Sequence, residues 1–181
     1  AVLLAVVGRV AAGWVPNSPA SDPALQINWN PVSETWKNLM LARGNRAVFL
    51  SLLGISWLWF FGSVFLTSFS SFSKEVLGGN ESVVTLLLAV FSVGIAIGSL
   101  LCEVLSGKKV EIGLVPFGSI GMTLFAVDLY FASHALKPAA LVGVAGFLAD
   151  SHNWRVMADL FLLAMFGGFY SVPLYSLVQS R

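Results

Sequence analysis

Few residues in this sequence could do chemistry, and the most informative of them lies inside a long apolar run. Asp128 is a carboxylate near the end of such a run. A carboxylate within a membrane span is costly, so it is retained where it faces a water-filled cavity or contacts a neighbouring helix. The first alternative predicts a residue that binds a proton, a cation or a cationic head group. The second predicts a structural hydrogen bond.

A second carboxylate, Asp159, follows Arg155 at the spacing that places two side chains on one helix face. This spacing favours an ion pair between them at the membrane interface. Near the start of a helix, the carboxylate would also complement the helix dipole. We therefore expect a structural role for Asp159, with a functional role as the alternative.

The sequence contains no constellation that indicates an enzyme. His134 and His152 lie in an exposed connection without a partnered Ser or Cys, and no Gly-Lys-Ser/Thr phosphate loop is present. The single cysteine, Cys102, lies in an apolar run and is expected to pack. We predict no catalytic site, no metal site and no cofactor. A net charge of +1 without a basic stripe also argues against nucleic acid as a partner.

Composition indicates which elements hold these residues. Hydrophobic residues make up 57% of the chain and charged residues 10%, against about 25% charged in an average soluble domain. A membrane span needs about 20 mainly apolar residues. Four runs meet this test, and a shorter run at residues 1–13 is predicted to be the end of another span. The four runs are 47–72, 82–105, 112–133 and 156–178. The predicted fold is an all-α, polytopic transmembrane helical bundle.

The segments between the spans predict the orientation of the bundle. Residues 14–46 are rich in Pro and polar residues and are predicted to be a linker, with a short interfacial helix at 33–40. Residues 139–149 are apolar but too short to span, so we expect a helix lying in the interface. Most Lys and Arg lie beside the linker, the turn after the second span and the C-terminus. The positive-inside rule places these three segments in the cytoplasm.

Aromatic and small residues within the first two spans suggest further roles. Trp57 and Trp59 lie in the middle of the first span, whereas interfacial aromatic residues lie at span ends. They could line a path for an acyl chain or face lipid. Gly94 and Gly98 in the second span form a small-xxx-small pattern, which predicts close packing against another helix.

The fourth span contains residues that could interrupt it. Gly167-Gly168 and Pro173 are helix-breaking types, and Tyr170 and Tyr175 lie beside them. A broken helix in a transporter often marks the substrate site or a hinge. A kink of purely structural origin is the alternative.

The turn after the second span resembles a cytoplasmic motif of the major facilitator superfamily of transporters, Gly-x-x-x-Asp-Arg-x-Gly-Arg-Arg/Lys. Glu103 stands near the position of the Asp, Val104 replaces the Arg, and the spacing is longer. The resemblance implies a partial major facilitator fold, from the end of span six to span ten. The remaining helices of the parent transporter would lie outside this chain. It also implies a gating role for the residues that match the motif, which are Gly98, Glu103, Gly107, Lys108 and Lys109.

Longer stretches resemble the lysophospholipid transporter branch of this superfamily. They are residues 28–31, 45–50, 53–57, 91–94 through 110–116, and 167–175. The resemblance implies a multi-pass protein of the bacterial inner membrane that moves lysophospholipids, such as lysophosphatidylethanolamine, through the lipid bilayer. Two alternatives stay open: a facilitator for another small solute or drug, and the membrane module of a fused acyltransferase. The residues we predict along the substrate pathway are Asp128, Trp57, Trp59, Tyr170 and Tyr175.

Overall fold

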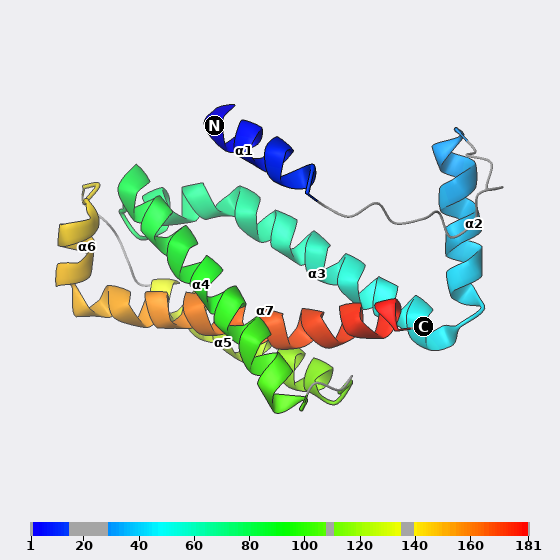
Figure 1. The fold of residues 1–181 in the computed structure, drawn as a ribbon. Helices are drawn as coiled ribbons and strands as arrows, with labels where there is room; N and C mark the ends of the chain where they lie inside the picture. The colour runs from blue at the N-terminus through cyan, green and yellow to red at the C-terminus, as the bar shows by residue number, and fades with distance from the viewer. Residues whose placement is uncertain (1, 15–28, 108–110, 135–139, 181) are drawn as a thin grey trace. The chain divides into compact units, whose positions relative to one another are not determined.

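The computed structural model of the protein describes residues 2–14, 29–107, 111–134 and 140–180. Within these ranges the chain is helical and contains no β-strand (Figure 1). The helices are α1 (Val2–Ala12), α2 (Pro31–Arg43), α3 (Arg46–Ser71), α4 (Glu81–Leu105), α5 (Leu114–His134), α6 (Val144–Ala149) and α7 (Ser151–Gln179). A π-helical turn, Phe72–Val76, extends α3. The structure divides into residues 1–38, which include α1 and the start of α2, and residues 39–181, which contain the other helices.

Among the described residues, four helices are long and apolar enough to cross a membrane, which confirms the predicted all-α polytopic bundle. They are Arg46–Val76, Glu81–Leu105, Leu114–His134 and Ser151–Gln179. Hydroxyl groups within them donate to their own helix backbone. Ser56 donates to the carbonyl of Leu52 at 2.8 Å, and Thr67 donates to that of Ser63 at 2.9 Å. These bonds suit a bilayer, where no water is present to satisfy polar groups.

Side-chain caps fix where three of the long helices begin. The side-chain oxygen of Asn45 accepts from the backbone of α3, and that of Asn80 accepts from the backbone of α4. Asp150 accepts from the N–H of His152 at 2.9 Å. Because of this cap, α7 begins at Ser151, five residues before the predicted start of the apolar run. Arg155 therefore lies within α7 and not in the connection before it.

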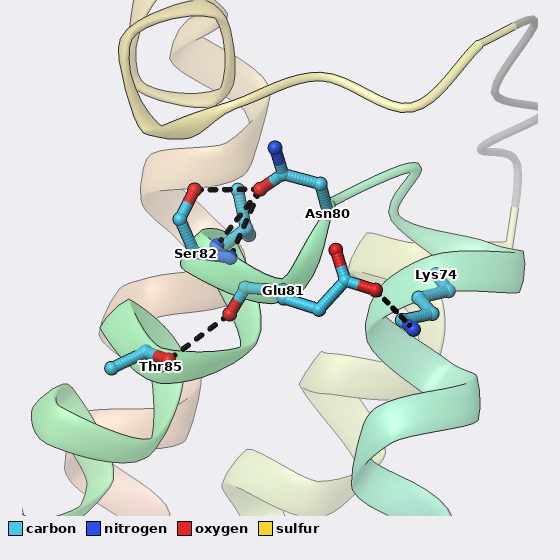
Figure 2. Close-up of polar contacts among 6 residues, drawn as sticks. Lys74, Asn80, Glu81, Ser82 and Thr85 are labelled. Atoms are coloured by element: carbon cyan, nitrogen blue, oxygen red, sulfur yellow. Dashed lines mark hydrogen bonds and ion pairs between the residues drawn. The ribbon is translucent and has the colours of Figure 1, made fainter.

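The connection between α3 and α4 is built from hydrogen bonds to a distant segment. Gly78 adopts a φ of 68°, which favours glycine, and its carbonyl accepts from the N–H of Val142 at 2.8 Å. The N–H of Asn80 donates to the carbonyl of Val142 at 3.0 Å. Figure 2 shows that Lys74 also reaches across the turn to Glu81, with 2.8 Å between Nζ and Oε1. The turn thus joins α3, α4 and the segment before α6.

The helix α7 packs against α3, α4 and α5, and small residues make two of these contacts close. A Cβ on Gly94 or Gly98 of α4 would collide with the carbonyls of Phe161 and Met165 on α7. A Cβ on Gly118 of α5 would lie 2.6 Å from the backbone nitrogen of Tyr170. Backbone-to-backbone approach of this kind is how membrane helices pack without a hydrophobic driving force.

The first alternative for the fourth span, a broken helix, is wrong. The helix α7 runs without a break through Gly167, Gly168 and Pro173 to Gln179. Gly168 serves packing, since a Cβ there would lie 2.7 Å from the backbone nitrogen of Ser99. Pro173 removes one backbone donor but does not end the helix.

The apolar core lies at one end of the bundle, where the π-helical turn, α6 and the start of α7 meet. Its fully buried members come from α3, α4, α5, α6 and α7. They include Phe69, Val83, Leu87, Leu129, Ala132, Phe147, Val156 and Leu160. Polar side chains close this end: the ring Nε2 of His152 lies 2.7 Å from the carbonyl oxygen of Ala132, and Asn153 donates to that of Phe147 at 2.9 Å.

Candidate functional site

A cavity of about 540 Å³ opens between α3, α5 and α7. Its α5 wall is formed by residues at helical spacing, from Ser119 to Phe131, and its α3 wall by Trp57, Leu58 and Phe61. Twelve residues of helix correspond to about 18 Å along the axis. The lining is mostly aliphatic and aromatic, with hydroxyl groups from Ser119, Thr123 and two tyrosines. These residues are Trp57, Leu58, Phe61, Ser119, Met122, Thr123, Ala126, Val127, Tyr130, Phe131 and Tyr170.

Two of the five predicted pathway residues line this cavity. Trp57 is 66% exposed and stacks at a tilt on Phe60, with 5.8 Å between ring centroids. Tyr170 closes the α7 side, and its hydroxyl donates to the carbonyl of Gly54 at 3.3 Å. The structure therefore brings together an aromatic side chain from each of α3 and α7 at one apolar surface.

Two other predicted residues form a hydrogen bond instead of lining the cavity. The indole Nε1 of Trp59 donates to the hydroxyl of Tyr175 at 2.6 Å. This bond links α3 to α7, two helices whose residues here are 116 positions apart in the sequence. Both side chains are exposed in the described bundle. Their hydrogen bond joins the same two helices as the bond from Tyr170 to Gly54.

The fifth predicted residue, Asp128, lies outside the cavity lining and forms an ion pair with a neighbouring helix. Arg155 of α7 donates to it twice, from Nη2 to Oδ1 at 2.5 Å and from Nε to Oδ2 at 3.2 Å. The prediction that Arg155 pairs with Asp159 is wrong. The guanidinium instead reaches across to α5, where it makes a two-pronged contact with one carboxylate, and such contacts are stronger and more specific than single ones. Asp128 is next to Val127, which lines the cavity.

The sequence did not predict the surroundings of Asp159. It is 3% exposed, and its Oδ2 atom is buried without a hydrogen-bond partner. It lies one turn after Arg155 and within interaction range of the Asp128 carboxyl group. The apolar residues around Asp159 were the sequence feature that could have indicated this burial. The way α5 crosses α7, which buries the side chain, cannot be predicted from the neighbouring residues.

The residues that match the cytoplasmic motif lie at the other end of α4. Glu103 is exposed, Gly98 packs against α7, and Gly107 adopts a φ of 57° in the turn that follows α4. Lys108 and Lys109 lie outside the described residues. The gating role of this set remains a prediction.

Four helices of the described residues that can cross a membrane, together with a largely apolar cavity between three of them, define this chain as a multi-pass helical membrane protein. Curated relatives specify it further. The chain is 27% identical over 180 residues to the lysophospholipid transporter LplT of two strains of Klebsiella pneumoniae, which covers 96% of this chain and 40% of each relative. It is 27% identical over 179 residues to LplT of Serratia proteamaculans, which covers 95% of this chain and 39% of that relative.

The chain thus spans about two fifths of the length of the curated relatives it matches. No protein-family model matches the chain, and no solved structure matches it. The named relatives are transporters, which fits the prediction that this chain is not itself an enzyme.

Proposed function

We propose that this chain is part of a major facilitator-type transporter that moves lysophospholipids across the bacterial inner membrane. The observation that supports this most strongly is the extent of the similarity to LplT, which covers 96% of the chain and therefore all four membrane-spanning helices. A similarity confined to one span would reflect only shared hydrophobicity.

The cavity suits the chemistry of a single-chain lipid. A lysophospholipid has one acyl chain, which needs an apolar wall, and a polar head group. Trp57, Phe61 and Met122 supply such a wall, and cavities of a few hundred Å³ with a small number of polar groups are typical of ligand sites. Asp128 directly follows Val127 of the cavity lining in α5, and its ion pair with Arg155 supplies charges for a charged head group.

The charge distribution suggests which way this site faces. Arg43 and Arg46 lie beside the start of α3, and the Lys108-Lys109 pair follows α4. Short loops rich in Lys and Arg stay in the cytoplasm. The opposite ends of the helices, including the ion pair of Asp128 and Arg155, would then face the periplasmic side, where a lysophospholipid of the outer leaflet would enter.

Uptake of labelled lysophosphatidylethanolamine by spheroplasts tests the proposal. The spheroplasts would express the complete protein that contains this chain, as the wild type, Trp57→Ala or Trp36→Ala. Removing an aromatic side chain that contacts the acyl chain loses on the order of 1.5 kcal/mol of apolar contact, or roughly tenfold in uptake efficiency. We expect this loss in Trp57→Ala. Trp36 is exposed and is not among the residues that line the cavity, so Trp36→Ala should match the wild type.

The result that would contradict the proposal is wild-type uptake no greater than that of an empty-vector control. A small solute or drug that is transported in its place would favour the first alternative function. Reacylation of the lipid by the purified protein would favour a fused acyltransferase outside this chain. Equal losses of uptake in Trp57→Ala and Trp36→Ala would support the lysophospholipid substrate but would contradict a role of the cavity in the transport pathway.

A further inference from the structure

One buried acidic side chain in the described bundle has a carboxyl oxygen without a hydrogen-bond partner. Asp159 lies on α7 among the buried apolar residues Val156, Leu160 and Leu163. Its Oδ2 atom has no hydrogen-bond partner. An ionised carboxylate in such a place loses its hydration without a hydrogen bond to replace it at Oδ2, which is a costly arrangement in a protein interior.

The guanidinium of Arg155 does not supply the missing hydrogen bond, because it already donates to another carboxylate. Arg155 directs both Nε and Nη2 at the carboxylate of Asp128. Asp159 and Asp128 also lie close enough to each other to interact. Two carboxyl groups therefore share one positive charge. If both were ionised, one negative charge would remain unbalanced within the membrane span.

Other polar and charged side chains at this end of the bundle make contacts elsewhere and not with Asp159. Lys74 of the π-helical turn pairs with Glu81 at the start of α4 at 2.8 Å (Figure 2). Asp150 caps α7, and His152 contacts the backbone of α5. Among the described residues, only Asp128 of α5 and Arg155 of α7 act on Asp159; α3, α4 and α6 contribute no charged group to it.

We propose that Asp128 and Asp159 together bind one proton, carried on Asp159, and that its binding and release are linked to transport. This inference rests on the proposed function. With the proton bound, Asp159 is a carboxylic acid that can donate its O–H to the Asp128 carboxylate, and the cluster is neutral. When the proton leaves to solvent, the Asp159 carboxylate competes with Asp128 for the Arg155 guanidinium. That competition weakens the ion pair between α5 and α7.

A proton fits this site better than a metal ion does. Sodium and divalent cations require several oxygen ligands. No group of three or more potential metal-ligating side chains occurs in the part of the chain that the structure describes. Asp159 is also buried, so a hydrated cation has no route to its free oxygen, whereas a proton needs no coordination shell.

Infrared spectroscopy of the complete protein in nanodiscs tests proton binding without any substrate. A protonated carboxyl group has a carbonyl stretch distinct from that of a carboxylate. We expect such a band to appear in the wild type as the pH falls from neutral into the mildly acidic range, to be lost in Asp159→Asn and to be retained in Glu103→Gln, whose carboxylate is exposed. If Asp159→Asn does not fold, titration of the wild-type band with pH serves in its place. Absence of the band from the wild type throughout this pH range would overturn the proposal.

Uptake of lysophosphatidylethanolamine at several pH values tests the link to transport. We expect the wild type to depend on pH and Asp159→Asn, which mimics the protonated acid, to lose that dependence. The same pH dependence in both proteins, or a dependence on sodium in place of pH, would overturn the proposal. Because the infrared band requires no substrate, it remains informative if the protein moves another solute, so failure of the proposed function is distinguishable from failure of this inference.

Discussion

At the scale of single residues, the contact between Trp59 and Tyr175 shows how aromatic side chains within spans can hold helices together. The bond from the indole Nε1 to the tyrosine hydroxyl is 2.6 Å long and connects α3 with α7. Interhelical hydrogen bonds in membrane proteins contribute about 0.6 kcal/mol on average, less than a simple low-dielectric argument suggests. The contact is therefore a modest but measurable part of the attachment of α3.

Substitution Tyr175→Phe should lower the free energy of unfolding by about 0.6 kcal/mol, because it removes the acceptor and keeps the ring. Thermal unfolding of the complete protein in detergent would measure this as a lower Tm. Tyr130→Phe is the matched control, since the Tyr130 hydroxyl makes no hydrogen bond within the described part of the chain. Adding Trp59→Phe to Tyr175→Phe should cause little further loss. Equal stability of Tyr175→Phe and Tyr130→Phe would show that the bond contributes nothing.

At this scale the sequence could indicate which residues are unusual for a membrane span, but not which partners they contact. Asp128 stands out as a carboxylate within an apolar run, yet its pairing with Arg155 depends on how α5 crosses α7. The spacing of Arg155 and Asp159 favoured a local ion pair, and a contact between helices replaced it. The spacing of residues within one helix cannot predict that Arg155 pairs with Asp128, because the packing of α5 on α7 brings the Asp128 carboxylate within reach.

At the scale of helices, the glycines of α4, α5 and α7 determine how closely the bundle packs. The adjacent residues Gly167 and Gly168 make this explicit. A Cβ on Gly168 would lie 2.7 Å from the backbone nitrogen of Ser99 and 2.8 Å from the carbonyl carbon of Gly98, whereas a Cβ on Gly167 meets no atom within 4 Å. Only one of the two is needed for the contact between α7 and α4.

The substitutions Gly167→Ala and Gly168→Ala should consequently have opposite effects. Alanine is favoured over glycine inside a helix by about 1 kcal/mol, so Gly167→Ala should leave stability unchanged or raise it. Gly168→Ala should lower it, because the added methyl group meets the backbone of α4, which cannot move aside as a flexible side chain would. Thermal unfolding of both variants measures the difference. A Gly168→Ala variant as stable as Gly167→Ala would contradict the close approach of α4 and α7.

The number and type of helices could be predicted from hydropathy, and their boundaries only in part. The four apolar runs correspond to α3, α4, α5 and α7. The polar start of α7 was missed because Asp150, Ser151 and His152 look like a loop, although Asp150 caps the helix. The continuity of α7 through Pro173 was missed because a proline within a span indicates a kink or a break without telling which.

At the scale of the whole molecule, we propose that the cavity between α3, α5 and α7 holds the acyl chain of a lysophospholipid. Two independent features support this proposal. The similarity to LplT extends over nearly the whole chain, and the described bundle contains an apolar cavity beside an ion pair. The sequence could suggest Trp57 and Tyr170 for this site. The α5 wall emerged only once the helices were placed in space.

The most direct test is photo-crosslinking with lysophosphatidylethanolamine that carries a photoreactive group in its acyl chain. The complete protein would be labelled in vesicles, with and without excess unlabelled lipid, and the modified residues would be mapped by mass spectrometry. The account predicts labelling of cavity residues such as Trp57, Met122 and Tyr170, reduced by the competitor, and little labelling of Leu66, which is exposed on α3 outside the cavity. Labelling that is spread over all exposed apolar residues and insensitive to the competitor would contradict it.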